Sequence, residues 1–463
     1  MSVSTGTARP SIKLDGKRRW VFYAVLYTNF VVWLDTAKFS ILTPFWAADL
    51  GADAGQIAAI SAAYLLGYFP MLFLAGVLAD RLGPRLMLLI CLSGVTVLGG
   101  SMAFVHTADE MYWRNLLFGV FFGFLWAPCQ RMLAVWFPPI ETAKVTAAWV
   151  ASQMIVALAA PLIALPIANA FAWQDAFLVI SALGVPALFA IALLTRNRPE
   201  ELPGITAQEL AHINVGRDED ARATVPFRDI VRVFRSRSVL FMVIAGALAT
   251  TPTWLIGTWS TYGLITLEGV DPSTVTYLVP LVSLPVILYA FGHGRAVAGP
   301  FRGRLRTPMV LGSVLSAIGF LAAGLLGLPW LGWIFAIGTL GYMVDPLFWG
   351  SLNTYWLGVA KPELTGTLNG VAAGLQVACG YVLVSLSGSW LNPSKSGLDQ
   401  LDSMWIIGGV IFVVSIIPVL LSKDVRIHSE PEPAPLPPLA AEVQPPTAIV
   451  EGPHGRVLPE PTA

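Results

Sequence analysis

The chain has 463 residues, of which 56% are hydrophobic and only 12% are charged, whereas soluble domains carry about 25% charged residues. The 28 basic residues balance the 28 acidic ones, which argues against a nucleic-acid-binding protein because that function needs a basic surface. Uncharged apolar runs of about twenty residues, the length of a membrane-spanning helix, recur along the chain. The composition therefore predicts an all-α membrane protein that crosses the lipid bilayer many times.

Twelve apolar segments are expected to cross the membrane in two groups of six. The first group comprises residues 20–46, 56–79, 86–105, 111–135, 145–169 and 174–195, and the second comprises residues 239–266, 274–298, 308–327, 331–356, 365–390 and 403–422. The expected organisation is an N-terminal segment (1–19), a first six-helix bundle (20–195), a polar central loop (196–238), a second bundle (239–422) and a tail (423–463). The tail is rich in proline and without periodicity, which predicts disorder.

The distribution of charge predicts the orientation. Lys and Arg concentrate in the N-terminal segment, the central loop and the connections after the second and eighth spans, whereas the other connections are mainly acidic. The positive-inside rule then predicts that both termini lie in the cytoplasm. We expect a monomeric, multi-pass protein of the cell (inner) membrane.

The connection after the second span carries a motif with a known parallel. It reads Gly76-Val-Leu-Ala-Asp80-Arg81-Leu-Gly83-Pro-Arg85 and resembles the G-x-L-a-D-r-x-G-x-r/k signature of the major facilitator superfamily. In physical terms, Gly76 allows close helix packing, Gly83 allows a tight turn, and the charged residues can contact neighbouring helix ends. The resemblance implies two pseudo-symmetric six-helix bundles that rock around a substrate between them.

Three further stretches are similar to the anion:cation symporter family within that superfamily. Residues 33–40 resemble its Y-L-D-R-x-N-x-S motif, residues 131–138 resemble N-x-R-x-x-x-x-W-F-P, and residues 346–349 with 366–370 resemble P-x-F-W and G-t-x-n-G. This likeness implies transport of an organic anion coupled to protons or sodium ions.

The chain departs from that family at two places. Thr36 stands where the family has a basic residue, and the span-four positions of the family's Arg, Gly and acid are held here by Asn115, Gly119 and Phe122. The intramembrane acid that the family associates with proton coupling is therefore absent from span four.

Ionisable residues inside the spans are the first site candidates, because each costs at least about 2.5 kcal/mol in the bilayer centre. Lys38 and Arg131 are predicted to contact an anionic substrate. The alternatives are a structural pair of Lys38 with Asp35, and an Arg131 side chain that extends to the cytoplasm. Asp35 is the first candidate for proton coupling, and Asp345, beside Pro346, is the second.

Uncharged groups at central depth are the second set of candidates, with helix-to-helix hydrogen bonding as the alternative role. The predicted substrate-binding residues of this kind are Gln130, Tyr27, Asn29, Trp259, Tyr262, Trp349, Asn353 and Gln376.

A third set is predicted to control gating. We expect Glu141 and Glu363 to form cytoplasmic ion pairs with the basic residues of the two connections. These pairs are expected to hold the outward-open state and to break when the halves rock. The gating residues are Gly76, Asp80, Arg81, Gly83, Arg85, Glu141, Arg304 and Glu363, with Arg302 and Arg306 as further partners.

The leading interpretation is a secondary transporter that moves a small organic anion, with a proton as the expected coupling ion. An exporter of amphiphilic compounds is the main alternative, and a membrane-embedded enzyme is a remote one. The five histidines form no metal-binding motif, no nucleophile motif or P-loop occurs, and the three cysteines all lie in apolar runs. We therefore expect no catalytic residues, no metal and no cofactor.

Overall fold

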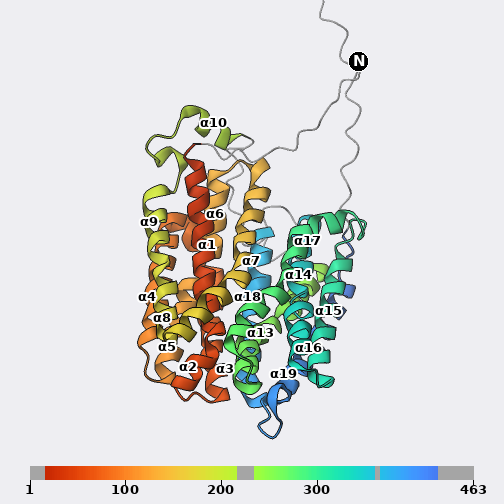
Figure 1. Ribbon diagram of the computed structural model, residues 1–463. Coiled ribbons are helices and arrows are strands. Elements are labelled where there is room, and N and C mark those ends of the chain that lie inside the picture. Colours follow the sequence, from red (N-terminus) through yellow and green to blue (C-terminus); the bar gives the residue numbers. More distant parts are fainter. Residues whose placement is uncertain (1–15, 216–233, 360–364, 426–463) are drawn as a thin grey trace, which may run out of the picture. The chain divides into compact units, whose positions relative to one another are not determined.

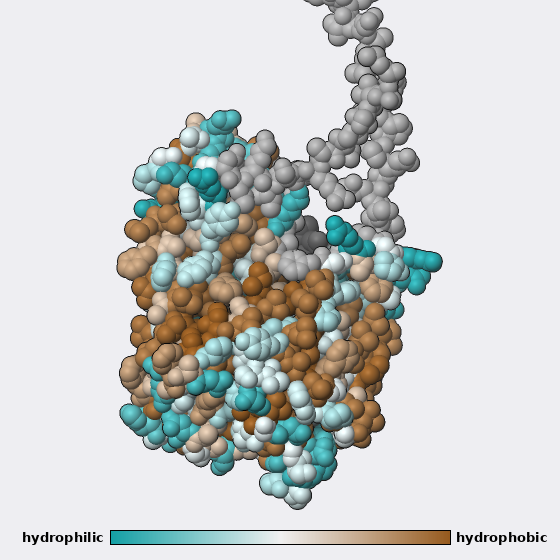
Figure 2. Space-filling view, in the orientation of Figure 1, coloured by the Kyte–Doolittle hydropathy of each residue, from teal (hydrophilic) through white to brown (hydrophobic). Residues whose placement is uncertain are grey.

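The computed structural model describes residues 16–215, 234–359 and 365–425, all of which belong to one unit, Met1–Ile427. Within these residues the regular elements are helices (Figure 1). Apolar side chains dominate the middle of the visible face and hydrophilic ones gather towards two ends (Figure 2). We call the end at which α1 begins the termini end, and the end that carries α2 the opposite end.

The first six expected spans appear as single helices or as broken ones, and the helix α10 (Ala207–Asn214) follows them. The elements are α1 (Arg18–Ile41), α2 (Thr43–Asp49), α3 (Ala54–Leu82), α4 (Pro84–Ser101), η1 (Met102–Phe104), α5 (Ala108–Phe122), α6 (Trp126–Trp136), α7 (Pro139–Ala170), α8 (Trp173–Ala182), α9 (Gly184–Leu194) and η2 (Pro199–Glu201).

The last six expected spans are more often interrupted. Their elements are α12 (Arg237–Thr250), α13 (Thr253–Tyr262), η4 (Gly263–Leu267), α14 (Pro272–Ala298), α15 (Arg306–Leu325), α16 (Trp330–Phe335), η5 (Ala336–Leu340), η6 (Asp345–Trp349), α17 (Gly350–Val359), α18 (Thr365–Ser387), η8 (Gly388–Trp390), η9 (Gly397–Leu401) and α19 (Asp402–Leu421). A short connection between α15 and α16 contains Gly327, whose φ of 53° is a conformation that glycine adopts readily.

Eleven helices of the described part of the chain are long and apolar enough to cross a membrane. The one expected span outside that set is the first of the chain, residues 20–46, which contains α1. Asn29, Asp35 and Lys38 lower its hydropathy. The helix nevertheless packs among the others, in contact with α7, α8 and α9. The polar residues of α1 are therefore held inside the protein rather than in lipid.

Glycines bring α3 and α5 into direct backbone contact. A Cβ atom placed on Gly119 would lie 2.1 Å from the carbonyl oxygen of Tyr64, and one on Gly67 would lie 2.1 Å from that of Leu116. Close approach through small residues is the main source of helix association in a bilayer, where lipid is as apolar as the helices. Gly119, taken from the sequence as a family position, is thus a packing residue here.

The two halves of the unit meet mainly along α3 and α18, with a second contact between α7 and α14. At the opposite end, a Cβ on Gly388 would lie 2.5 Å from the carbonyl oxygen of Ala54. Further along, a Cβ on Gly374 would lie 2.3 Å from the ring of Phe73. Beyond this point, a Cβ atom placed on Gly76 or on Gly370 would have no described heavy atom of another residue within 4 Å. The contact between the halves thus runs along α3 from Ala54 to Phe73, and Gly76 and Gly370 lie beyond it.

This geometry corrects the expectation for Gly76. The sequence predicted that it allows close helix packing, but in this conformation a Cβ atom at Gly76 would face open space.

The contact at Gly119 yields a stability test. Gly119→Ala places a methyl group against the Tyr64 carbonyl, so we expect the free energy of unfolding to fall by about 1–3 kcal/mol. Gly76→Ala is the matched control, since its methyl group meets nothing and alanine favours helix. Thermal unfolding in detergent, followed by tryptophan fluorescence, measures both. Equal melting temperatures for the two variants would contradict the described packing.

Candidate functional site

The tenth span is the most irregular in the described part of the chain. It passes from α16 through the π-helical segment η5, a turn at residues 341–343 and a second π-helical segment, η6, before α17 begins. Asp345 opens η6, and Pro346 follows it without a backbone N–H to donate. Single π-helical turns are frequent at functional sites, and irregular backbone at membrane depth is tolerated where it is buried in protein or lines a cavity.

Neighbouring helices occupy three sides of η6. Leu347 packs against Gly312 of α15, Phe348 lies near Gly246 of α12, and Gly350 lies against His293 of α14. Asp345 and Trp349 lie on the remaining side, and both are half-buried. Within the described residues, the Asp345 carboxylate makes no ion pair and no hydrogen bond, so it is a half-buried acid without a partner.

An aromatic cluster joins the two halves at the centre. The rings of Trp33 and Phe122 are 5.1 Å apart, those of Tyr64 and Phe122 are 5.3 Å apart, and Tyr64 approaches Trp254 of α13 to 6.3 Å. Phe122, which takes the place of the acid expected from the family resemblance, is 1% exposed within this cluster. The centre of the first half is thus apolar where the related family carries charge.

Asp35 and Lys38 form the buried ion pair that their spacing predicted. The Lys38 ammonium also donates to the carbonyl of Phe177 at 3.1 Å, and Ser181 of α8 donates to both carboxylate oxygens of Asp35, at 3.0 and 3.2 Å. A Cβ on Gly99 of α4 would lie 2.6 Å from Asp35, so this glycine makes room for the acid.

The position of this pair differs from the expectation that Lys38 contacts substrate. Lys38 is 1% exposed and Asp35 is 3% exposed, because both side chains turn from α1 towards α8 and α4. In this conformation neither group reaches a solvent-accessible surface, so the structure favours the structural role for the pair.

Arg131 is the accessible cation among the predicted substrate residues. It is 54% exposed, and its Nε lies 3.4 Å from Asp80, which is 65% exposed. The exposed pair contributes only about 0–1 kcal/mol, so an anionic ligand can displace it. Gln130, the next residue, accepts a hydrogen bond from Thr146 of α7 at 3.4 Å.

Three of the other predicted polar residues form hydrogen bonds to neighbouring helices. Asn29 is fully buried and donates to the Trp149 carbonyl and to Ser152, while Tyr27 donates to the Leu183 carbonyl. Trp259 is fully buried and donates to Ser387 at 2.8 Å. These three side chains join helices, which was the alternative role.

Three others are only half-buried: Tyr262, Trp349 and Gln376. The side chain of Asn353 lies outside the described residues.

The gating residues have other partners than expected. Glu141 is buried and binds Arg18 at 2.9 Å and His212 of α10 at 3.1 Å, rather than the arginines of the loops. Arg18 lies at the start of α1, so this cluster fastens α1, α7 and α10 together. Glu363 lies outside the described residues.

The predicted turn after the second span is confirmed in its geometry. Gly83 has a φ of 87°, a conformation that glycine adopts readily. Arg85 donates to the Ala192 carbonyl at 2.5 Å, which ties this turn to α9. Arg81 and Arg304 are exposed and form no ion pair with a described residue.

Sequence reasoning missed Ser181, Gly99, Arg18 and His212. Ser181 and Gly99 are small residues in apolar runs, and Arg18 is one of several basic residues before the first span. No local pattern distinguishes them, because their partners lie far away in the sequence.

Two helical halves in contact along α3 and α18, with a broken helix that carries an intramembrane acid, are typical of polytopic membrane transporters. The sequence profile of the Major Facilitator Superfamily matches residues 25–378, and the chain belongs to this family. It is a multi-pass membrane protein with the fold of this superfamily, in agreement with the expected fold class.

Individual proteins agree with this assignment. The chain is 25% identical over 253 residues to the hexuronate transporter of Bacillus subtilis, covering 54% of this chain and only 58% of that relative. It is 24% identical to a probable hexose phosphate transport protein of Chlamydia pneumoniae, covering 74% and 78% of the two chains. A solved D-xylose-proton symporter has a TM-score of 0.69 at 14% identity, covering 87% of this chain and 97% of its own, which shows the shared fold.

The Asp35–Lys38 pair yields a second test. Removing one partner leaves a buried charge, so Lys38→Met and Asp35→Asn should each lower the free energy of unfolding by about 3–5 kcal/mol. The double variant Asp35→Asn/Lys38→Met should recover most of that loss, because it leaves no charge unpaired. Melting temperatures of the purified variants measure the coupling. A double variant whose loss is the sum of both single losses would show that the two charges do not interact.

Proposed function

We propose that this protein is a secondary active transporter that moves a small organic anion, in particular a carboxylate, by alternating access with proton coupling. The half-buried, unpartnered carboxylate of Asp345 in the broken tenth span carries the proposal. The substrate would bind between the two halves, near the middle of the membrane.

The anionic character of the substrate is supported by the relatives and by Arg131. Hexuronates and hexose phosphates are both organic anions. Arg131 offers an exposed guanidinium whose interaction with Asp80 is weak, and a carboxylate can accept two hydrogen bonds from such a group. We propose Arg131 as the substrate contact, with Lys38 as the partner that holds Asp35.

Proton coupling is assigned first to Asp345. A proton carrier must exchange with water on one side of the membrane, and Asp345 is partly accessible, whereas Asp35 is closed off by Lys38 and Ser181. A transient opening of the Asp35–Lys38 pair would be needed before Asp35 could accept a proton. Asp35 is therefore the second site in this proposal.

The orientation follows from the positive-inside rule. Arg18, Arg85 and Arg196 lie at the termini end, so we propose that this end faces the cytoplasm and that the described conformation is open towards it. The contact of α3 with α18 would then close the outer side.

Export of an amphiphilic compound is the second candidate. The aromatic cluster of Trp33, Tyr64, Phe122 and Trp254 and the burial of Lys38 favour it, because they leave the centre with more aromatic surface than charge.

Transport into liposomes tests the proposal. Purified protein should take up a labelled organic acid from a panel of hexuronates, aldonates and sugar phosphates, and an inward proton gradient should concentrate it inside. Asp345→Asn should still exchange internal for external substrate but lose accumulation driven by the pH gradient. Uptake of none of these anions, together with transport of amphiphilic dyes, would favour the exporter instead.

Asp271→Asn is the matched control. Hydrogen bonds from the side chain and backbone of Ser273 hold the pKa of Asp271 below the usual aspartate range, so it stays ionised near neutral pH and carries no proton. This variant should accumulate substrate like the unmodified protein. If Asp345→Asn does so as well, Asp345 is not the carrier, and the same comparison is made with Asp35→Asn.

A further inference from the structure

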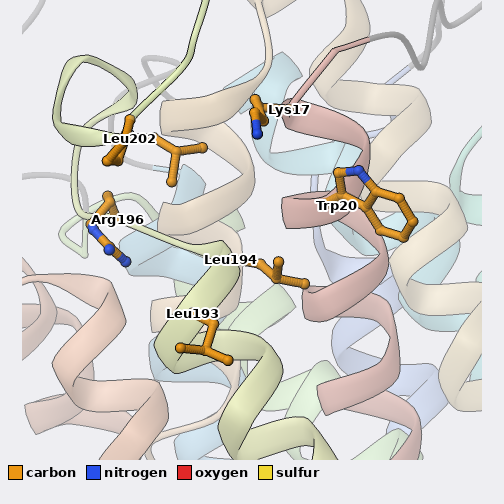
Figure 3. Close-up of a pocket in the computed structure, with 7 residues that line it drawn as sticks. Lys17, Trp20, Leu193, Leu194, Arg196 and Leu202 are labelled. Carbon is orange, nitrogen blue, oxygen red and sulfur yellow. The ribbon is translucent and has the colours of Figure 1, made fainter.

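A cavity of about 470 Å³ lies at the termini end of the first half, away from the contact between the halves. It is bounded by the start of α1, the end of α9 and the segment that follows α9. The lining residues include Lys17, Trp20, Leu193, Leu194, Arg196 and Leu202 (Figure 3).

Two cations stand at this cavity without acidic partners. Lys17 is exposed and Arg196 is half-buried, and neither forms an ion pair with a described residue. The Arg196 guanidinium donates only to the Thr195 and Ala192 carbonyls at the end of α9, at 2.7 and 3.3 Å. No acidic residue lines the cavity. Its chemistry therefore suits an anion.

The adjacent charges are already occupied. Arg18, one residue beyond Lys17, is 2% exposed and binds Glu141 at 2.9 Å. The carboxylate of Glu209 accepts the backbone N–H of Arg18 at 2.8 Å. Lys17 and Arg196 are thus the two cations that line the cavity, and neither has an acidic partner among the described residues.

An apolar strip leads from the cavity along α9 towards the middle of the membrane. Val185, Phe189 and Leu193 are 45%, 58% and 67% exposed, and their spacing of four residues places them on one face of the helix. Eight residues of helix span about 12 Å. Exposed apolar side chains on a membrane-spanning helix face lipid tails, so this strip can accompany an acyl chain.

Aromatic residues of α1 flank the side of the cavity that lies across from α9. Trp20 and Tyr23 on α1 are 48% and 51% exposed, and such residues favour the level of the lipid headgroups. In Figure 3, Lys17 and Arg196 lie on two sides of the cavity, with Leu194 and Leu193 between and below them. The cavity thus has cations at headgroup level and apolar side chains at tail level.

We propose that this cavity binds an anionic phospholipid of the surrounding leaflet. Its phosphate would lie between Lys17 and Arg196, and one acyl chain would follow Leu193 and Phe189. Pairs of basic residues beside membrane-spanning helices recognise anionic headgroups in this way. The bound lipid would bridge the start of α1 and the end of α9, and so stabilise the region where α10 docks on Arg18.

Native mass spectrometry of the full chain in detergent tests the proposal, with phosphatidylglycerol as the probe. The unmodified protein should bind a first phosphatidylglycerol more tightly than phosphatidylethanolamine. Lys17→Gln/Arg196→Gln should weaken that binding by about fivefold for each charge removed. Leu193→Ser should weaken it as well, because the acyl chain loses its contact, and this separates lipid from free phosphate. Excess inorganic phosphate should not displace the lipid.

Arg235→Gln/Arg237→Gln is the matched control, since these two residues are exposed and begin the second half. This variant should keep the affinity of the unmodified protein, with an unchanged melting temperature in all variants confirming folding. Equal affinity for phosphatidylglycerol in the Lys17/Arg196 variant, or displacement of the lipid by inorganic phosphate, would overturn the proposal.

Discussion

The contact between α3 and α18 is the constraint on which the rest of the structure depends. Gly374 of α18 and Gly388 of η8 let this part of the second half approach α3 to van der Waals distance. In lipid the helices gain little hydrophobic free energy by associating, so small residues and close packing decide where the two halves hold together. The position of this contact supports the proposal that the opposite end is closed in this conformation.

The proposed function depends on the residues that this packing leaves at the centre of the protein. The aromatic cluster links the halves through Tyr64 and Trp254, and in the broken tenth span Asp345 has no partner among the residues that the structure describes. A charge without a partner at membrane depth is costly, and a protein that retains one must gain from its protonation or its binding. The buried Asp35–Lys38 pair shows the opposite solution, in which a counter-ion and a serine satisfy the acid completely.

Much of the fold was accessible from the sequence, and less of the site. Apolar runs and charge positions predicted the spans, and a local spacing of three residues predicted the Asp35–Lys38 pair, because both depend on neighbours in the sequence. The side of α1 that the pair faces depends on α4 and α8, and Glu141 binds Arg18, 123 positions earlier in the chain. Hydropathy and spacing hold no information on such contacts. They also missed the helix breaks at Leu42 and at residues 123–125.

In the proposed transport cycle the halves close at the opposite end and open at the termini end, and transport exchanges these two states. Spin labels can test it in a chain whose Cys91, Cys129 and Cys379 have been replaced. Without substrate, the pair Gly55→Cys/Ser389→Cys should give a short distance and Gly76→Cys/Gly370→Cys a longer one. When substrate and a pH gradient are applied to protein in liposomes, the first distance should lengthen as the second shortens. Distances that change in the same direction, or that stay fixed in protein that transports, would contradict the account.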